Sequence, residues 1–355
     1  MSLSIGIVGL PNVGKSTLFN ALLKKQQAFV ANYPFATIEP NIGIVPVPDY
    51  RLERLAQIVQ DTESHGSKPP IIPATVSFVD IAGLVKGASV GEGLGNKFLS
   101  HIREVDAIVQ VVRYFKDSNV VRSESSTDAK SDLEVVNTEL ILADLQTLEK
   151  QQEPRKAPTK EDVYRWEAVQ KLRKGLDEGK LAKDVSLTEE ESEAAKSLQL
   201  MTFKPMFIIA NVDEEDLKKD FGSDVIPVSA KTESELSELS QEEQAQYLKE
   251  LGVEQSGLER VITEGYKILE LISFLTAGEK EVRAWTIKKG TSAVNAAGVI
   301  HTDFTKKFIK AEVVSFDDFV GNKGWKGSRE NGKTRFEGRD YIVKDGDVIE
   351  FKIGT

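Results

Sequence analysis

Gly9-Leu-Pro-Asn-Val-Gly14-Lys15-Ser16 is the stretch of sequence that decides the fold. It fits the pattern G-x-x-x-x-G-K-S, follows an apolar run at 3–8 and precedes a helix-like run at 16–25. Glycines let backbone amides close around phosphate oxygens, and the following helix adds the positive end of its dipole. The stretch therefore predicts a nucleotide-phosphate site, in which Lys15 bridges the β- and γ-phosphates and Ser16 binds Mg²⁺.

Four further apolar runs predict strands downstream of this loop. They cover residues 76–80, 107–112, 206–211 and 225–228, are short and rich in branched residues, and mostly end at a polar or glycine-containing turn. Because strands alternate with helices along this part of the chain, we expect an α/β fold with a mostly parallel sheet.

The alternation stops between about residues 132 and 200, where the sequence is highly charged. Two runs there carry apolar residues at helical spacing, around 133–148 and 163–172. Thr159 and Thr188, each followed three residues later by an acidic residue, are typical helix starts. We expect an antiparallel helical arm inserted into the α/β domain, with the apolar stripes as its internal seam.

From about Ser273 the pattern changes to short strands, predicted at 282–287, 311–314, 341–343 and 348–353, with one helix near 292–299. This predicts a small sheet-rich module. The segment 233–250, rich in Glu, Ser and Gln, is left open as a helix or a loop.

Charge and composition narrow the class of protein. The 355 residues suggest two or three domains, and the net charge of −10 disfavours indiscriminate nucleic-acid binding. Residues 273–355 carry 15 Lys and Arg against 12 Asp and Glu, whereas residues 1–272 carry 31 against 44. There is no cysteine, no metal-ligand pair of histidines, no long apolar stretch and no signal-like start, so we expect a soluble intracellular protein.

Two later segments supply the parts that bind Mg²⁺ and sense the γ-phosphate. Asp80 ends an apolar strand and can hold Mg²⁺ through water, while Gly83 can offer its N–H to the γ-phosphate. Thr37 lies in a proline-flanked loop and can reach Mg²⁺ only when a γ-phosphate is present. The expected metal ligands are Ser16, Thr37 and Asp80. Five glycines between 83 and 95 favour a nucleotide-sensing switch over an ordinary loose loop.

Asn211-Val-Asp-Glu214 and Ser229-Ala-Lys231 follow strands at the positions where a base would be read. In the related sequence N-K-x-D, the carboxylate accepts the N1–H and N2–H donors of guanine. Here Val212 replaces the lysine, and the longer Glu214 moves the carboxylate. The amide of Asn211 can serve the acceptor and donor of adenine, so ATP is favoured over GTP, which remains the alternative.

Together these residues resemble the Obg-like ATPases of the YchF subfamily, among the translation-factor-type P-loop GTPases. The resemblance covers essentially the whole chain, and its most specific segments are 9–17, 80–88, 211–214, 282–286 and 298–304.

The resemblance implies a P-loop NTPase fold with a Ras-like, OBG-type G domain, an inserted α-helical coiled-coil arm and a C-terminal ubiquitin-like β-grasp (TGS) domain. The expected boundaries are 1–132 with 201–272 for the G domain, 133–200 for the arm and 273–355 for the TGS domain.

The resemblance also implies function. Such proteins bind ATP and hydrolyse it slowly. They bind ribosomes (the large subunit or the 70S particle) and RNA in the cytoplasm and are associated with stress responses. Neither a membrane nor DNA is expected as a partner. A GTPase switch and a nucleotide-gated RNA or ribosome binding module with negligible hydrolysis are the alternatives. The expected nucleotide ligands are Asn12, Val13, Gly14, Lys15, Ser16, Thr17, Asn211, Val212, Glu214, Ser229 and Ala230.

Catalysis raises a specific question, because Leu84 stands where relatives use a glutamine to orient the attacking water. Leucine cannot hydrogen-bond, so slow turnover is expected. Asn12 matches an asparagine that helps hold K⁺ in potassium-activated relatives, although it could simply brace the loop. Gln110 stands where relatives carry a histidine, and could orient water but not take up a proton. The expected catalytic residues are Lys15, Asn12, Gly83 and Gln110.

Basic and aromatic residues alternate in the last module. Lys306, Lys307 and Lys310 form one cluster, and 323–339 holds six more Lys and Arg with Trp325 and Phe336 among them. This composition is typical of RNA contacts, and a solvated basic face is the alternative.

Overall fold

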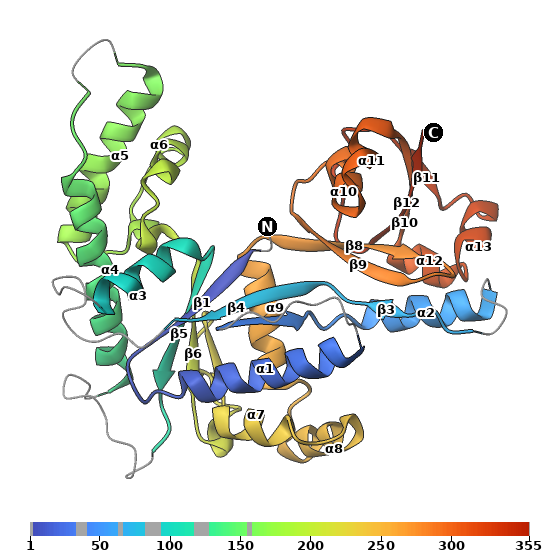
Figure 1. The fold of residues 1–355 in the computed structure, drawn as a ribbon, viewed down its shortest axis with the longest axis horizontal. Coiled ribbons are helices and arrows are strands. Elements are labelled where there is room, and N and C mark those ends of the chain that lie inside the picture. Colours follow the sequence, from blue (N-terminus) through green and yellow to red (C-terminus); the bar gives the residue numbers. More distant parts are fainter. Residues whose placement is uncertain are drawn as a thin grey trace. The chain divides into compact units, whose positions relative to one another are not determined.

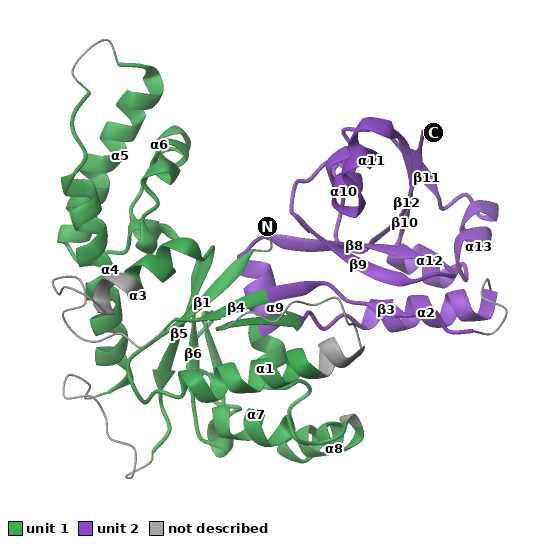
Figure 2. Ribbon diagram, in the orientation of Figure 1, with its two compact units in different colours: residues 1–45, 77–261 green, residues 46–76, 262–355 purple. Residues whose placement is uncertain are grey.

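A computed structural model of the chain describes residues 3–32, 41–62, 67–81, 94–116, 128–154 and 158–354, without the side chains of 28–32, 94–97 and 241. The chain divides into two compact units (Figure 2). The first holds residues 1–45 and 77–261, and the second holds residues 46–76 and 262–355.

The first unit contains a six-stranded sheet in the order β2-β4-β1-β5-β6-β7 (Figure 1). Strands β4, β1, β5, β6 and β7 pair in parallel. The parallel α/β sheet predicted from the apolar runs is therefore confirmed. The strands are β1 (Ser4–Val8), β2 (Ile42–Pro46), β4 (Thr75–Asp80), β5 (Ala107–Arg113), β6 (Met206–Asn211) and β7 (Val225–Val228).

Helices connect these strands and bury their apolar sides. The first begins at the lysine of the phosphate loop and runs beyond the predicted 16–25. The segment 233–250 forms the end of one helix and most of another, with a turn at 237–240 between them. Ser240 and Glu243 form a capping box at the start of the second helix, and Gly252 ends it at φ 65°. The helices are α1 (Lys15–Asn32), α3 (Leu94–Glu104), α7 (Ala230–Leu236) and α8 (Gln241–Leu251). Helix α9 (Gly257–Ile268) begins in this unit and ends in the second, which starts at Ile262.

The inserted helical arm is present in the first unit, where α4 packs against α5 and α5 against α6 (Figure 1). Both capping boxes are confirmed, since Thr159 caps with Asp162 and Thr188 with Glu191. The apolar stripes form an internal seam that includes Leu148 and Leu172. The arm consists of α4 (Ala129–Glu149), α5 (Lys160–Asp177), α6 (Glu189–Ala195) and the 3₁₀ turns η1 (Ala182–Asp184), η2 (Lys196–Leu198) and η3 (Met201–Phe203).

One buried carboxylate ties this arm together. Asp144 on α4 is 1% exposed and accepts the N–H groups of Met201 and Thr202 at 2.8 and 2.7 Å. The hydroxyl of Thr202 donates to it as well, at 2.7 Å. Burial raises the pKa of Asp144, against the opposing effect of these hydrogen bonds. The carboxylate thus fixes the return of the chain to the sheet.

The second unit contains another six-stranded sheet, in the order β11-β10-β12-β8-β9-β3. Its core includes Phe274, Val313 and Ile349 and is covered by α10. The strands are β3 (Ile71–Ile72), β8 (Leu271–Ala277), β9 (Val282–Lys288), β10 (Phe308–Ser315), β11 (Arg335–Glu337) and β12 (Asp347–Ile353); the helices are α2 (Tyr50–Thr62), α10 (Ala293–Ile300), α11 (Thr302–Lys307), α12 (Phe316–Gly321) and α13 (Trp325–Glu330).

The second unit differs from the sequence prediction in several ways. The one helix predicted after residue 273 is joined by three more, α11, α12 and α13, and strand β11 was not predicted. The predicted strand at 341–343 is wrong, because only an isolated bridge joins Ile342 to Ser292. Residues 46–76, expected with the nucleotide domain, pack with the C-terminal sheet: β3 pairs with β9, and α2 contacts β8 and β9. The domain boundaries drawn above stay a prediction.

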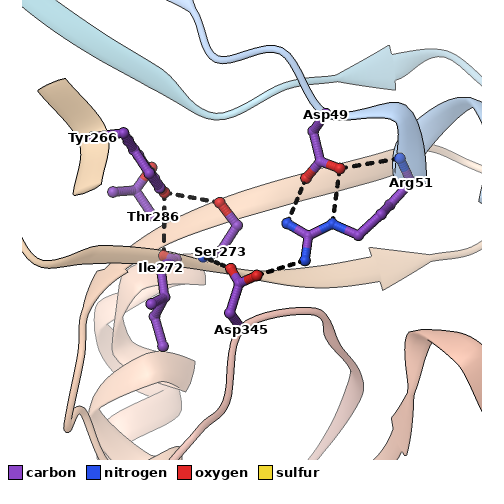
Figure 3. A network of polar contacts seen from close by, with 7 residues as sticks. All are labelled: Asp49, Arg51, Tyr266, Ile272, Ser273, Thr286 and Asp345. Carbon is purple, nitrogen blue, oxygen red and sulfur yellow. Dashed lines mark hydrogen bonds and ion pairs between the residues drawn. The ribbon is translucent and has the colours of Figure 1, made fainter. Parts of the chain in front are cut away.

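A polar network joins these two parts of the second unit (Figure 3). The guanidinium of Arg51 donates twice to Asp49, at 2.8 and 2.7 Å, and once to Asp345, at 2.7 Å. Asp345 also accepts the N–H of Ser273 at 2.9 Å. The phenol of Tyr266 lies 2.8 Å from the Ser273 hydroxyl. A segment distant in sequence is therefore held to the C-terminal sheet by charge-assisted hydrogen bonds.

None of the described helices combines the length and the apolar character that crossing a membrane requires.

Candidate nucleotide-binding site

The phosphate loop runs from the end of β1 to the start of α1, as the sequence predicted. Its backbone enters the left-handed region at Asn12, with φ 62°, and at Gly14, with φ 97°. Asparagine and glycine tolerate this region better than other residues. The N–H of Leu18 then donates to the Gly14 carbonyl at 3.0 Å, which begins the helix.

Close backbone approaches explain both glycines of the motif. A Cβ on Gly9 would lie 2.5 Å from the carbonyl oxygen of Val111, on the neighbouring strand β5. A Cβ on Gly14 would lie 2.2 Å from the side-chain nitrogen of Asn211. Any side chain at either position would push the loop away from the sheet.

Lys15 is curled back onto its own loop. Its ammonium group donates to the carbonyls of Gly9 and Leu10, at 2.9 and 2.7 Å, and the residue is 7% exposed. Burial lowers the pKa of Lys15 to about 8, against the attraction of Asp80. The ammonium thus lies in a poorly hydrated place, where a phosphate oxygen would replace the carbonyls as its partner.

Asp80 and Ser16 are the described candidates for Mg²⁺. Asp80 ends β4, pairs in register with Ile7 of β1, and lies close enough to Lys15 to influence its charge. Burial raises the pKa of Asp80, and Lys15 opposes that shift. Ser16 is exposed at the first turn of α1. A hydroxyl and a carboxylate suit an oxygen-seeking cation that also takes phosphate and water ligands.

Asn211 links the phosphate loop to the segment that follows β7. Its amide nitrogen donates to the carbonyl of Val13 at 2.8 Å, and its amide oxygen accepts the N–H of Ala230 at 3.0 Å. The residue is 5% exposed. Both ends of the amide are therefore used to bridge two loops; direct reading of a base by Asn211 stays a prediction.

The predicted base residues come together around one cavity of about 700 Å³. Its lining includes Gly14 and Thr17 from the loop, and Asn211, Glu214 and Ser229 from the later strands. Val212 also lines it, but the residue is 2% exposed and packs against Ala210 and Leu217. The structure therefore brings residues of the phosphate loop and of both predicted base segments to one cavity, and their roles as nucleotide ligands stay a prediction.

The sequence analysis did not predict several residues of the lining, among them Phe115 and Lys116 after β5 and Thr232, Ser234 and Glu235 of α7. Phe115 and Lys116 follow β5, and the Phe115 N–H donates to the Asn211 carbonyl at 3.0 Å. The guanidinium of Arg113 lies 4.4 Å from the Phe115 ring centroid. The position just after a strand was a signal that could have found Phe115 and Lys116, because that is where such sheets bind ligands.

Gln110 is not brought to the cavity. It lies within β5, is 3% exposed, and donates through its side-chain nitrogen to Asn137 of α4 at 2.8 Å. A role in positioning water therefore has no support from its placement, and the contact suggests that it joins the sheet to the arm.

Several predicted switch residues lie outside the described residues. They are Thr37, Gly83, Leu84 and the glycines at 87, 91 and 93.

The basic cluster of the second unit separates into two groups. Arg329 pairs with Glu312 and Glu350, and Trp325 is 7% exposed with its indole N–H on the Ala277 carbonyl. Phe336 is different, being 60% exposed with the Lys310 ammonium 3.7 Å from its ring centroid.

Comparison with known proteins adds independent findings. Residues 4–143 match the family described as 50S ribosome-binding GTPase, and residues 271–354 match the YchF GTPase C-terminal family, described as a protein of unknown function (DUF933). The chain is 47% identical to the ribosome-binding ATPase YchF of Bacillus subtilis and 48% identical to that of Haemophilus influenzae, over 100% of each chain.

A solved structure agrees along the same length. The Schizosaccharomyces pombe YchF GTPase superimposes with a TM-score of 0.85 at 38% identity, over 99% of this chain and 98% of that one. The P-loop α/β fold expected from the sequence is thereby confirmed.

Proposed function

The chain belongs to the YchF family, and on that premise we propose that it is a ribosome-associated ATPase that binds ATP with Mg²⁺ and hydrolyses it slowly. The observation that supports this most directly is the single cavity in which the phosphate loop meets the ends of β6 and β7. Asn211 fixes that junction with both ends of its amide.

The phosphate loop and the base segments have distinct roles in this proposal. Lys15 and the amides of Val13–Thr17 hold the phosphates, and Ser16 and Asp80, with Thr37, hold Mg²⁺, which screens charge on the phosphates when bound. At the other end the rim formed by Ser229 and Ala230 holds the base. Phe115 supplies an aromatic face in place of the lysine stem that Val212 lacks.

Equilibrium binding of ATP and GTP analogues, side by side with Mg²⁺ and K⁺, tests this proposal first. We expect tighter binding of ATP, and turnover that disappears in Lys15→Ala. Tighter binding of GTP would make the protein a GTPase switch instead. Binding of ATP with turnover no greater than in Lys15→Ala would favour a nucleotide-gated binding module.

We also propose that Asn12 helps to hold K⁺ beside the phosphates, which would supply positive charge in the transition state. ATPase rates measured in KCl and in NaCl at equal ionic strength test this. Faster turnover in KCl is expected, and equal rates would exclude the role.

Ribosome association is proposed to involve Lys306, Lys307 and Lys310, with Phe336 stacking on an RNA base. Co-sedimentation with ribosomes should weaken steeply with salt, and further when Phe336 and Lys310 are both changed to alanine. Unchanged co-sedimentation would move the contact elsewhere on the protein.

A further inference from the structure

Two hydroxyl groups hold the carboxylate of Glu214 at the base end of the cavity. The phenol of Tyr247 donates to Glu214 Oε2 at 2.9 Å, and the hydroxyl of Thr232 donates to the same oxygen at 3.2 Å. Glu214 opens the 3₁₀ turn η4 (Glu214–Asp216), Thr232 lies on α7 and Tyr247 lies on α8. Three separate elements therefore converge on one oxygen atom.

Neighbouring residues hold the two donor hydroxyl groups in position. Thr232 is 3% exposed, and its single hydroxyl proton is shared between Glu214 and the hydroxyl of Ser229, the N-cap of α7, which lies 2.9 Å away. Tyr247 is carried by a helix with defined caps at both ends. The hydrogen bond to the Glu214 carboxylate raises the pKa of Tyr247 above its usual value.

Guanine and adenine present different hydrogen-bonding groups to a carboxylate at this position. Guanine presents two donors, N1–H and the N2 amino group, and a carboxylate with open lone pairs accepts both. Adenine presents an acceptor at N1, which a carboxylate repels, and a donor only at N6. Because both hydroxyls lie on Oε2, a carboxylate held in this way offers only Oε1 freely. It can then accept the two guanine donors on separate oxygens only by giving up a hydrogen bond at Oε2, which reduces its advantage for guanine.

We propose that Tyr247 and Thr232 form a hydroxyl latch on Glu214 that removes the guanine-selecting carboxylate from the base site. The latch is a specificity device for the proposed ATPase activity and rests on that proposal. It gives a role to α8, whose sequence matches neither the phosphate motif nor the base motif. It also explains how an acidic residue can remain in the cavity wall of a protein that prefers adenine.

The test removes the hydroxyl groups one at a time. Tyr247→Phe deletes one, and Tyr247→Phe with Thr232→Val deletes both with little change in shape. Dissociation constants for fluorescent ATP and GTP analogues are measured with Mg²⁺. We expect the preference for ATP over GTP to fall about threefold in the single variant and about tenfold in the double, chiefly through tighter GTP binding.

Two controls connect the effect to Glu214. Adding Glu214→Ala to the double variant should abolish the gain in GTP binding, because the freed carboxylate is its source. Tyr164→Phe, on α5 of the arm, removes a tyrosine hydroxyl away from the cavity and should leave the preference unchanged.

An unchanged preference in Tyr247→Phe, in protein with wild-type thermal stability, would overturn the latch even if the double variant failed to fold. A gain in GTP binding that survives Glu214→Ala would overturn it too. Wild-type protein that binds neither nucleotide, or prefers GTP, would overturn the proposed function itself, which separates the two failures.

Discussion

The environment of Lys15 in the phosphate loop favours binding of an anion. Its ammonium group is buried and held by two carbonyl oxygens, which are weaker partners than a phosphate. Burial disfavours the charged form of Lys15 and lowers its pKa to about 8. A triphosphate would restore the favourable environment and raise that pKa again.

The first prediction concerns pH and nucleotide affinity. Because the charged lysine binds phosphate and its pKa in the free protein is about 8, affinity for ATP should fall as pH rises through 8. About a tenth of the lysine stays protonated one unit above its pKa, so the affinity should fall about tenfold between pH 7 and 9. Titration with a fluorescent ATP analogue measures this. Lys15→Ala should bind weakly with no such slope, and an equally steep slope in that variant would assign the effect to another group.

The second prediction concerns Gln110. Its side chain is buried between β5 and α4 and bonded to Asn137, so Gln110→Ala should leave turnover at saturating ATP within about twofold and lower the free energy of unfolding by about 1 kcal/mol. Steady-state ATPase assays and denaturant unfolding measure the two effects. A loss of turnover of tenfold or more, with stability unchanged, would instead support the water-positioning role predicted from the sequence.

At the scale of elements, the arm depends on more than its apolar seam. The capping boxes at Thr159 and Thr188 start two of its helices, and these are local signals that the sequence displays openly. The link from α4 to η3 is different, because one buried carboxylate receives three hydrogen bonds from residues 57 and 58 positions away.

The third prediction is that Asp144→Ala weakens the arm. Removing the carboxylate leaves two buried N–H groups and one hydroxyl without an acceptor, which should cost about 2–4 kcal/mol of the free energy of unfolding. Hydrogen exchange would show the loss at α4 and η3, while ATP affinity stays near that of the wild type. Asp184→Ala, which removes only an exposed ion pair with Lys183, is the matched control and should change little. Equal stability of the two variants would contradict this account.

At the scale of the whole molecule, the chain builds its two units from interrupted segments. Residues 46–76 leave the nucleotide sheet after β2, complete the second unit with α2 and β3, and return at β4. They lie in sequence between Thr37 and Asp80, the two predicted Mg²⁺ ligands that flank the segment. The Arg51 network secures this inserted segment to Asp345 near the C-terminus.

The fourth prediction is that Arg51→Met destabilises the second unit. Its side chain is 17% exposed and its loss leaves Asp49 and Asp345 without their shared partner, which should cost about 2 kcal/mol. Two of the three tryptophans, Trp285 and Trp325, lie in this unit. In a Trp166→Phe background, their fluorescence reports its unfolding.

The control for Arg51 comes from the same unit. Lys68→Met breaks an exposed ion pair with Glu53 and should have little effect. If both variants unfold at the same denaturant concentration, the Arg51 network is not what holds residues 46–76 in place.

Local patterns in the sequence determined much of this protein. The phosphate loop, the parallel strands, the capping boxes and the arm all rest on neighbours within a few residues, so their signals are contiguous. The segments predicted to hold a base were also chosen from local signals, because they immediately follow two predicted strands.

Only the tertiary structure decided what depends on distant partners. The membership of residues 46–76 in the second unit follows from pairing of β3 with β9 and from Arg51 meeting Asp345, which are separated by 294 residues. The sequence likewise does not reveal that Asn211 bridges two loops or that Tyr247 and Thr232 both contact Glu214, because these partners are distant in sequence. A side chain's free hydrogen-bonding capacity depends on its neighbours in space, and residue type alone does not give them.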